Sequence, residues 1–396
     1  MSIETVSTSA INAQPYFPTA AVAQRIRSID ALRGLVMLVM LLDHVRERFF
    51  LHRQVSDPMD VEFTEPALFA SRFLAHFCAP IFIFLTGLSA WLYQQSARAE
   101  SVSTFLLKRG LLLIALEFTL VTFSWMGNFN TIYLQVIWVI GLSMLALALL
   151  VKMPKVARWI VAVAIIALHN LLTPIQFSAG EWGYSLWTIL HDRNYWIKTD
   201  WIAIKVSYPV LPWIGVILLG YCAGPIFSKQ MPAARRVIWL IAGGVCSLLL
   251  LMLLRGANLY GETLPWQSFA SPVQTLMSFF NFTKYPPSLD FLLLTLGVMA
   301  LLLVWLERFN AARFVGVLAQ FGAAPLFFYL LHLYVLLVIY SLLLAWFGAN
   351  QGSYFGVGSV YSIWLISMVL ALLLYWPTAA FAAYKRRSTY GWIKYL

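Results

Sequence analysis

The amino-acid sequence predicts an all-α bundle of about ten membrane-spanning helices, with both termini on the cytoplasmic side. Hydrophobic residues make up 61% of the 396 residues, and charged residues only 11%. Soluble domains carry about 25% charged residues, and the mean hydropathy of this chain is +0.79. Such a chain has too few polar side chains to cover a water-facing surface, so a lipid bilayer is its expected environment.

The predicted spans are apolar stretches that approach the roughly 20 residues needed to cross a bilayer. They cover residues 29–49, 66–93, 104–125, 132–151, 156–172, 206–226, 237–254, 289–306, 325–347 and 361–383. Residues 173–205 and 255–288 form long outer loops rich in Trp, Tyr, Asn and Pro, which suit an interfacial belt or stacking against carbohydrate. Residues 311–324 are expected to form a short amphipathic helix on the inner surface.

Basic residues lie in every second loop, as the positive-inside rule requires of cytoplasmic loops. They account for the net charge of +11 without nucleic acid as a partner, because no basic stretch interleaves with a soluble fold. The pattern divides the chain into a polar cytoplasmic tail (1–24), a membrane domain (25–384) and a basic cytoplasmic tail (385–396). The basic positions are Arg25, Arg27, Arg98, Lys108, Arg109, Lys152, Lys155, Arg158, Lys229, Arg235, Arg236, Arg308, Arg313, Lys385, Arg386 and Arg387.

The loop after the first stretch breaks this pattern, because it holds basic and acidic residues together. They are expected either to belong to a site or to form local ion pairs, and they comprise Arg46, Arg48, Arg53, Asp57, Asp60, Glu62 and Glu65. The three cysteines lie in apolar stretches without a paired spacing, so neither a disulfide nor a metal site is predicted.

Ionisable side chains inside the apolar stretches are the candidate functional residues. A charge at mid-helix costs about 2.5–3.5 kcal/mol on insertion scales, so such residues usually have a role. The candidates are Arg33, Asp43, His44, Arg72, His76, Glu117, Asp290 and His332.

The first stretch carries the sharpest pattern, with Arg33 and His44 eleven positions apart. At about 100° and 1.5 Å per residue, the two side chains share one helix face about 16 Å apart. A long, phosphate-bearing donor could lie along this face, with Arg33 binding phosphate and His44 exchanging a proton. The alternatives are a snorkelling anchor for Arg33 and an interfacial hydrogen bond to Asp43 for His44.

The second stretch places Arg72 and His76 on one face, and Pro80 is expected to kink the helix beyond them. His76 should lie at the depth of His44, because the two helices are antiparallel. The two histidines could then form an acid–base site, or serve as polar contacts between helices.

Three further candidates have simpler alternatives. Glu117 is expected to meet a cation, with Arg33 or Arg109 as a structural partner, or to take part in catalysis. Asp290 either favours a helix N-terminus or binds an acceptor group. His332 is either a hydrogen-bonded core histidine or catalytic.

Several stretches, taken in order, resemble the transmembrane acyltransferase superfamily. Ser28-Ile-Asp-Ala-Leu-Arg-Gly34 followed by His44 resembles the Arg–ten residues–His pattern in the first helix of its acyltransferase-3 branch. The closer resemblance is to the bacterial family related to the heparan-α-glucosaminide N-acetyltransferase catalytic domain. The supporting stretches are residues 42–46, 76–87, 212–215, 219–221, 284–288 and 325–332.

The resemblance implies transfer of an acetyl or other acyl group, to nitrogen or oxygen, from cytoplasmic acetyl-CoA to a glycan or amino sugar outside a bacterial inner membrane. Arg33, with Lys108 and Arg109, would hold the CoA phosphates. His44, oriented by Asp43 and assisted by His76, would act as general base or transient acyl carrier. The expected acceptor-binding residues are Arg46, Arg72, Asp290 and His332. His52 and His76 stay open as the catalytic histidine, and a homodimer stays open as the assembly.

The alternative function is a proton-coupled transporter or flippase, in which the same intramembrane groups would relay protons or bind a solute. Transporters often contain internal repeats with paired broken helices, and the sequence shows no such repeat. Bound CoA would favour the enzyme, whereas a flux that depends on a proton gradient would favour the transporter.

Overall fold

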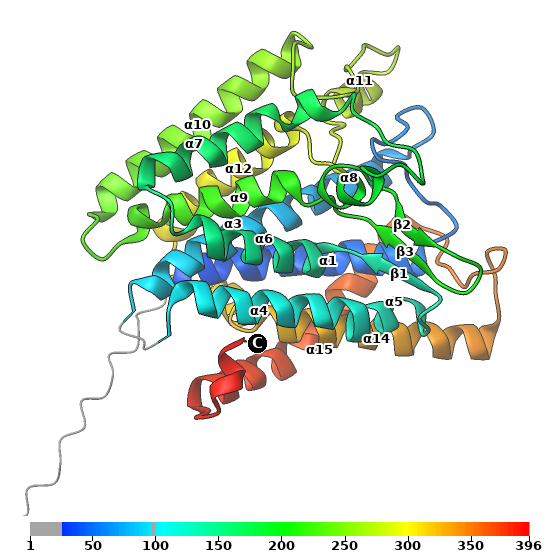
Figure 1. The fold of residues 1–396 in the computed structure, drawn as a ribbon. Helices are drawn as coiled ribbons and strands as arrows, with labels where there is room; N and C mark the ends of the chain where they lie inside the picture. The colour runs from blue at the N-terminus through cyan, green and yellow to red at the C-terminus, as the bar shows by residue number, and fades with distance from the viewer. Residues whose placement is uncertain (1–25, 97–99, 396) are drawn as a thin grey trace, which may run out of the picture.

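The computed structural model describes residues 26–96 and 100–395 and is a bundle of helices with a small sheet at one end (Figure 1). The predicted tail 1–24 lies outside the described residues. The longer helices are α1 (Arg27–Phe49), α2 (Pro66–Leu74), α3 (Cys78–Gln94), α4 (Val102–Leu116), α6 (Val136–Leu150), α7 (Lys155–Leu168), α9 (Leu211–Cys222), α10 (Ala233–Gly256), α12 (Leu289–Arg308), α13 (Arg313–Phe321), α14 (Pro325–Phe347) and α15 (Val360–Arg387). Shorter elements are α5 (Thr122–Met126), α8 (Tyr184–Leu190) and α11 (Pro272–Phe279), and the strands β1 (Thr131–Leu134), β2 (Tyr195–Lys198) and β3 (Ala203–Val206).

Within the described residues, six helical spans are long and apolar enough to cross a membrane. They are Pro66–Gln94, Lys155–Leu172, Ala233–Gly256, Leu289–Arg308, Pro325–Phe347 and Val360–Arg387. Of the other predicted spans, α1 has the length but carries several charges, and α6 and α9 are apolar but only 15 and 12 residues long. The total of about ten spans, and the orientation of the termini, therefore stay predictions.

The loops gather at two ends of the bundle. The sheet, α8 and α11 lie at the right-hand end of Figure 1, whereas the loops that join α6 to α7 and α9 to α10 lie at the left-hand end. The second group belongs to the loops in which basic residues were expected. This separation agrees with the alternation of basic loops along the sequence.

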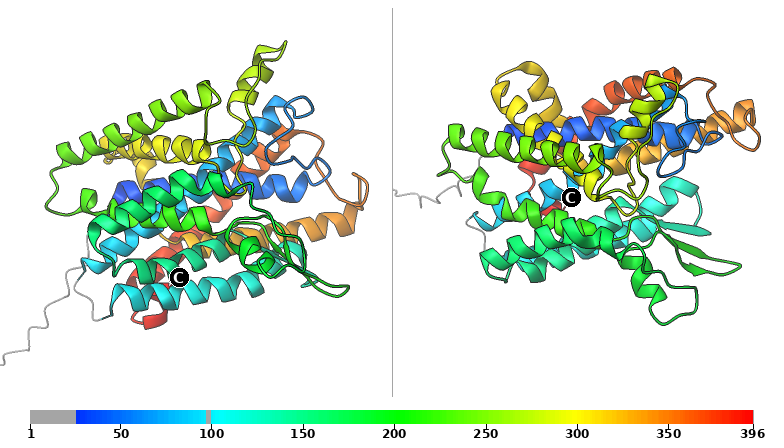
Figure 2. Two further views of the ribbon diagram at one scale, coloured as in Figure 1. Left: turned by 45° about the horizontal axis from the view of Figure 1, so that its top comes forward. Right: turned by 90° about the horizontal axis from the view of Figure 1, so that it is seen from above.

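Helix α1 runs through the interior of the bundle (Figure 2). It packs against α3, α12, α13, α14 and α15. The predicted segment 311–324 contains a helix, α13, which packs closely along α1, and its place on the inner surface stays a prediction. A helix with so many neighbours can keep charged side chains out of lipid, because other helices supply their partners.

Close helix pairs meet through facing glycines. A Cβ on Gly34 would overlap the carbonyl oxygen of Leu318, and one on Gly322 would overlap that of Asp30, across the α1–α13 contact. Small residues let helix backbones approach closely. In a lipid bilayer no hydrophobic effect drives helices together, so they associate through close packing of this kind.

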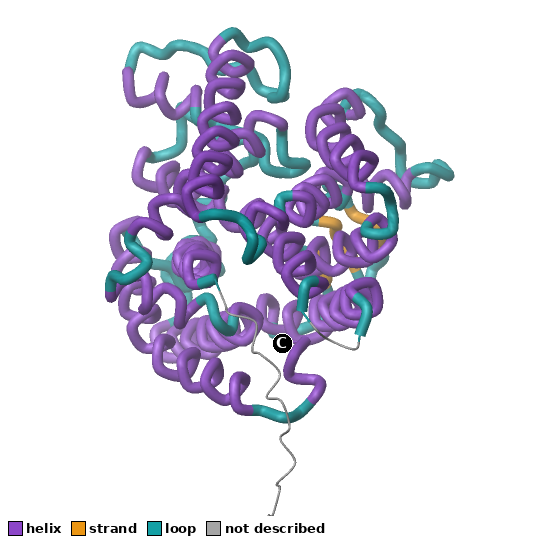
Figure 3. Tube along the Cα trace, turned by 90° about the vertical axis from the view of Figure 1, so that its left-hand side faces the viewer, coloured by secondary structure: helices purple, strands orange, loops and turns teal. Residues whose placement is uncertain are grey.

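A three-stranded sheet in the order β1–β3–β2 departs from the all-helical expectation. β1 pairs with β3 in parallel, with Thr131 opposite Ala203, and β2 pairs with β3 antiparallel. The fourth predicted span was therefore placed too early, because residues 131–134 are a strand and α6 begins at Val136. Figure 3 shows how little of the molecule the strands occupy.

Pro80 breaks the helix that was predicted over residues 66–93. A 3₁₀ turn, η1 (Ala75–Phe77), separates α2 from α3 and contains His76. Proline has no N–H to donate to the carbonyl four residues earlier, and its ring crowds that carbonyl. That carbonyl belongs to His76, which lies in the 3₁₀ turn, so the expected kink takes the form of this turn before Pro80.

Candidate functional site

His44 and His332 form the centre of the candidate site. Nδ1 of His44 lies 2.7 Å from Nε2 of His332, and Nδ1 of His332 lies 2.7 Å from the carbonyl oxygen of Phe328. The two rings are stacked with centroids 5.0 Å apart. His332 is fully buried, whereas His44 keeps 8% of its surface accessible.

This geometry assigns the hydrogens of two neutral imidazoles. A carbonyl oxygen only accepts, so Nδ1 of His332 donates to Phe328 and its Nε2 is an acceptor. Nδ1 of His44 must then donate to His332, which leaves the lone pair of His44 on Nε2. No hydrogen bond to that nitrogen is made by the described part of the chain. The carbonyl–His332–His44 chain therefore presents one oriented base.

Aromatic rings surround this base. Trp125 meets the His44 ring edge-on at 5.0 Å, and Tyr329 at 5.9 Å. Trp125 lies at the end of the third predicted span, and Tyr329 lies one turn before His332 on α14. These rings restrict water around His44, which strengthens polar interactions there.

The sequence predicted that Asp43 orients His44. In the structure, Asp43 pairs with two arginines instead. Its Oδ1 accepts from Nε and Nη2 of Arg46 at 3.0 and 2.9 Å, and its Oδ2 accepts from Nη1 of Arg72 at 3.3 Å. Neighbouring residues on a helix point about 100° apart, so Asp43 faces α2 while His44 faces α14. His332 supplies the orienting contact instead.

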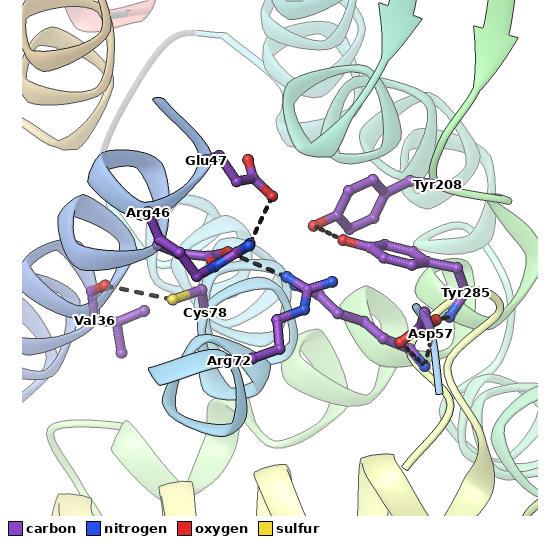
Figure 4. A network of polar contacts seen from close by, with 10 residues as sticks. Val36, Arg46, Glu47, Asp57, Arg72, Cys78, Tyr208 and Tyr285 are labelled. Carbon is purple, nitrogen blue, oxygen red and sulfur yellow. Dashed lines mark hydrogen bonds and ion pairs between the residues drawn. The ribbon is translucent and has the colours of Figure 1, made fainter. Parts of the chain in front are cut away.

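Arg46 and Arg72 belong to a wider cluster of polar side chains (Figure 4). Arg46 also donates to Oε1 of Glu47 at 3.1 Å. Glu47 keeps 34% of its side-chain surface accessible, although it lies on a helix packed on several sides. On the far side, Tyr285 donates to the hydroxyl of Tyr208 at 3.0 Å. In Figure 4, Glu47, Arg72 and the two tyrosines face a common space.

Asp57 anchors the loop before α12 to this cluster. Its carboxylate accepts from the backbone N–H groups of Lys284 at 3.1 Å and of Tyr285 at 3.0 Å. Burial raises the pKa of Asp57, while Arg72 and Lys284 act in the opposite direction. Two other charged residues of this loop, Arg53 and Glu65, lie 4.0 Å apart as an exposed local ion pair.

His76 does not pair with His44. It is buried between the rings of Phe73 and Phe291, with centroids 5.9 and 5.2 Å away, and its Nδ1 has no hydrogen-bond partner among the described residues. It lies within Coulombic range of Arg72 and Asp43. His76 therefore borders the polar cluster, and its assistance in catalysis stays a prediction.

Glu117 meets the start of α6, and none of the described cations pairs with it, so the expected partnership with Arg33 or Arg109 is wrong. Its Oε2 accepts from the backbone N–H of Trp138 at 2.8 Å, in the first turn of α6. A helix N-terminus carries unpaired N–H groups and a positive dipole end, and both favour a carboxylate. Glu117 is the first residue of a π-helical segment, η2 (Glu117–Val121). The regular α-helical hydrogen bonds of α4 are interrupted at this segment.

The expected CoA-binding residues lie at the opposite end of α1. Arg33 donates to Asp30 at 2.7 Å and to Ser89 on α3, and Arg109 lies within Coulombic range of Arg33. Lys108 is paired with Glu100 at 2.7 Å. Arg33 and Lys108 are therefore already paired with carboxylates, and binding of the CoA phosphates stays a prediction for these residues.

Asp290 lies in the first turn of α12, as predicted, and is buried. Its backbone N–H donates to Gly261 at 3.1 Å, and its Oδ1 has no partner among the described residues. It borders a small hollow with Arg255 and Glu262. A role in binding an acceptor stays a prediction for this residue.

An apolar groove of about 870 Å³ lies between α1, α12 and α13. It is lined by Leu35, Val298, Leu301, Leu302, Trp305, Phe314, Val317 and Leu318. The lining of this groove offers no acid or base.

Sequence reasoning missed Glu47, Lys284, Tyr208 and Tyr285 as site residues. Lys284 and Tyr285 lie in a stretch that supported the resemblance, but no periodicity indicated that this loop folds back onto α2. Glu47 could have been found from its spacing, because it lies three residues beyond His44 and so on the same side of α1.

The fold and the site define a helical membrane protein with a buried, oriented acid–base pair. Residues 25–255 match the family described as Heparan-alpha-glucosaminide N-acetyltransferase, catalytic. This is more than half of the chain, which therefore belongs to that family and is a membrane enzyme of the acetyltransferase type. No curated protein matches the chain. The matched range includes Arg33, Asp43 and His44, whereas Lys284 and His332 lie beyond it. The Arg–ten residues–His spacing stays a resemblance.

Proposed function

We propose that the protein transfers an acetyl group from cytoplasmic acetyl-CoA to an amino sugar or other glycan on the outer side of a bacterial inner membrane. The oriented Nε2 of His44 carries this proposal, because acyl transfer needs a base at the attacking amine or hydroxyl. The family match supports an acetyltransferase in general.

The acetyl donor supplies a thioester carbonyl and a thiolate leaving group. Arg33 and Arg109 hold its phosphates at one end of α1, about 16 Å along the helix from His44. His44 removes a proton from the acceptor through Nε2 while the acceptor nitrogen or oxygen attacks the thioester carbonyl, and His332 stabilises the resulting imidazolium by accepting from its Nδ1. The acetyl carbon thereby gains its bond to the acceptor, and its bond to sulfur breaks to release the thiolate. The proton then passes from His44 to the leaving thiolate.

The decisive experiment is calorimetric titration of the detergent-purified protein with acetyl-CoA. Saturable binding is expected for the wild type, and Arg33→Ala should weaken it by about tenfold or more, because it removes a phosphate contact. Arg53→Ala is the matched control, since Arg53 is exposed in an ion pair with Glu65. A folded wild-type protein that does not bind acetyl-CoA would exclude the proposed donor.

A further inference from the structure

The side chain of Lys284 lies in the polar cluster, where the described residues offer its ammonium group no hydrogen-bond acceptor. Only 2% of the residue is accessible. Its backbone N–H is used by Asp57, but its Nζ makes no hydrogen bond or ion pair within residues 26–96 and 100–395. The rings of Tyr285 and Tyr208 lie 5.2 and 6.0 Å from Nζ. A buried ammonium is unfavourable unless an acceptor satisfies it.

The nearby carboxylates are already committed to other donors. Asp43 uses one oxygen for Arg46 and the other for Arg72. Asp57 accepts the two backbone N–H groups of the loop before α12. Glu47 accepts from Arg46 through Oε1. These groups stabilise Lys284 over a distance, but none of them is its hydrogen-bond acceptor.

Arg72 adds a second unused donor beside Lys284. The residue is 6% accessible, and its Nε is buried without a partner among the described residues. Arg193 lies over the ring of Tyr285 at 4.5 Å. The cluster holds three buried cations, Arg46, Arg72 and Lys284, beside the three carboxylates of Asp43, Glu47 and Asp57, and the exposed Arg193 adds a positive charge at its edge.

We propose that Lys284 and Arg72 bind an anionic oxygen group, a carboxylate or a phosphate, on the sugar that accepts the acetyl group. This inference rests on the proposed function for the identity of the ligand. The side chains of Tyr208 and Tyr285, joined by a hydrogen bond between their hydroxyl groups, border this position. Glu47, accessible and one turn beyond His44 on α1, extends the site toward the base. The acceptor class is thus an acidic sugar.

The test is calorimetric titration of the purified full chain with three sugars, without acetyl-CoA. Glucuronic acid carries a carboxylate, glucosamine 6-phosphate carries a phosphate, and glucosamine carries neither. At least one acidic sugar should bind about tenfold or more tightly than glucosamine. The acidic sugar that binds identifies which anionic group the site takes.

Lys284→Met should reduce the affinity for the acidic sugar to that for glucosamine, whereas Lys284→Arg should retain most of it. Lys198→Met is the matched control, because Lys198 is exposed on β2. Equal binding of glucosamine and the acidic sugars by the wild type overturns the inference, as does full affinity in a folded Lys284→Met protein.

Acetyl-CoA titrated into the same samples separates this inference from the proposed function. If acetyl-CoA binds but no acidic sugar does, the anion site is wrong and the donor assignment stands. If the acidic sugar binds and acetyl-CoA does not, the anion site stands and the proposed donor is wrong.

Discussion

His44 and His332, 288 positions apart in the chain, share a hydrogen bond of 2.7 Å between Nδ1 and Nε2. The carbonyl of Phe328 fixes the direction of this bond. The pair therefore works as a unit, with His44 as the base and His332 as a positioning residue.

Replacing His44 with Gln should lower acetyl transfer about 100- to 10,000-fold, because a general base contributes that much to the rate. His332→Phe should lower kcat with little change in KM and shift the pH profile of kcat, since it changes the orientation and charge stabilisation of His44. Steady-state kinetics at several pH values test this. His52→Gln is the control; if it abolishes transfer while His44→Gln does not, His52 is the base.

Replacing Asp43 with Asn should destabilise the protein by about 3–5 kcal/mol, because the buried guanidinium groups of Arg46 and Arg72 lose their counter-ion. Glu65→Gln removes an exposed ion pair and should cost at most about 1 kcal/mol. Chemical unfolding in detergent measures both. Equal effects would contradict the central role given to Asp43.

Replacing Glu117 with Ala should destabilise the protein by about 1–3 kcal/mol, since the buried N–H of Trp138 loses its acceptor. Glu117→Gln keeps an acceptor oxygen and should cost less. The midpoint of thermal unfolding distinguishes the two variants. A larger loss with Gln than with Ala would argue that the charge itself pairs elsewhere.

Replacing Gly87 with Ala should prevent the close contact between α3 and α9, because its Cβ would overlap the carbonyl oxygen of Ile217. Overpacking of this kind costs about 1–3 kcal/mol or more. Gly243→Ala on α10 is the matched control, with nothing within 4 Å of the new Cβ, and should stabilise its helix by about 0.5–1 kcal/mol. Thermal unfolding compares them, and equal stability would contradict this packing.

Affinity for glucuronic acid should rise as the pH falls through the raised pKa of Asp57. Protonation of Asp57 removes one negative charge from the cluster, so an anion binds more tightly. The same shift means that this carboxyl favours folding most below its ordinary pKa of 3.8, and less as the pH rises through its raised pKa. Asp57→Asn should bind tightly and show no such pH dependence by calorimetry.

Several features of the protein could be predicted from the sequence, because they depend on composition or on residues close together in the chain. Composition indicated a helical membrane protein, and the missing N–H of Pro80 indicated an irregularity in the second span, which the structure places at Ala75–Phe77. The apolar periodicity of residues 311–324 indicated α13, and the cost of buried charge selected Asp43, His44 and His332 as candidates. These features depend on residues within a few turns of one another.

Pairing across the fold was decided only by the tertiary structure. Apolar helix faces are nearly equivalent in lipid, so periodicity does not show which helix meets which. The contact of α14 with α1 gave His44 the partner His332 in place of Asp43 or His76, and the contact of α4 with α6 gave Glu117 a helix end in place of a cation. The loop before α12 brought Lys284 into the cluster, because the oxygens of Asp57 hold its backbone there.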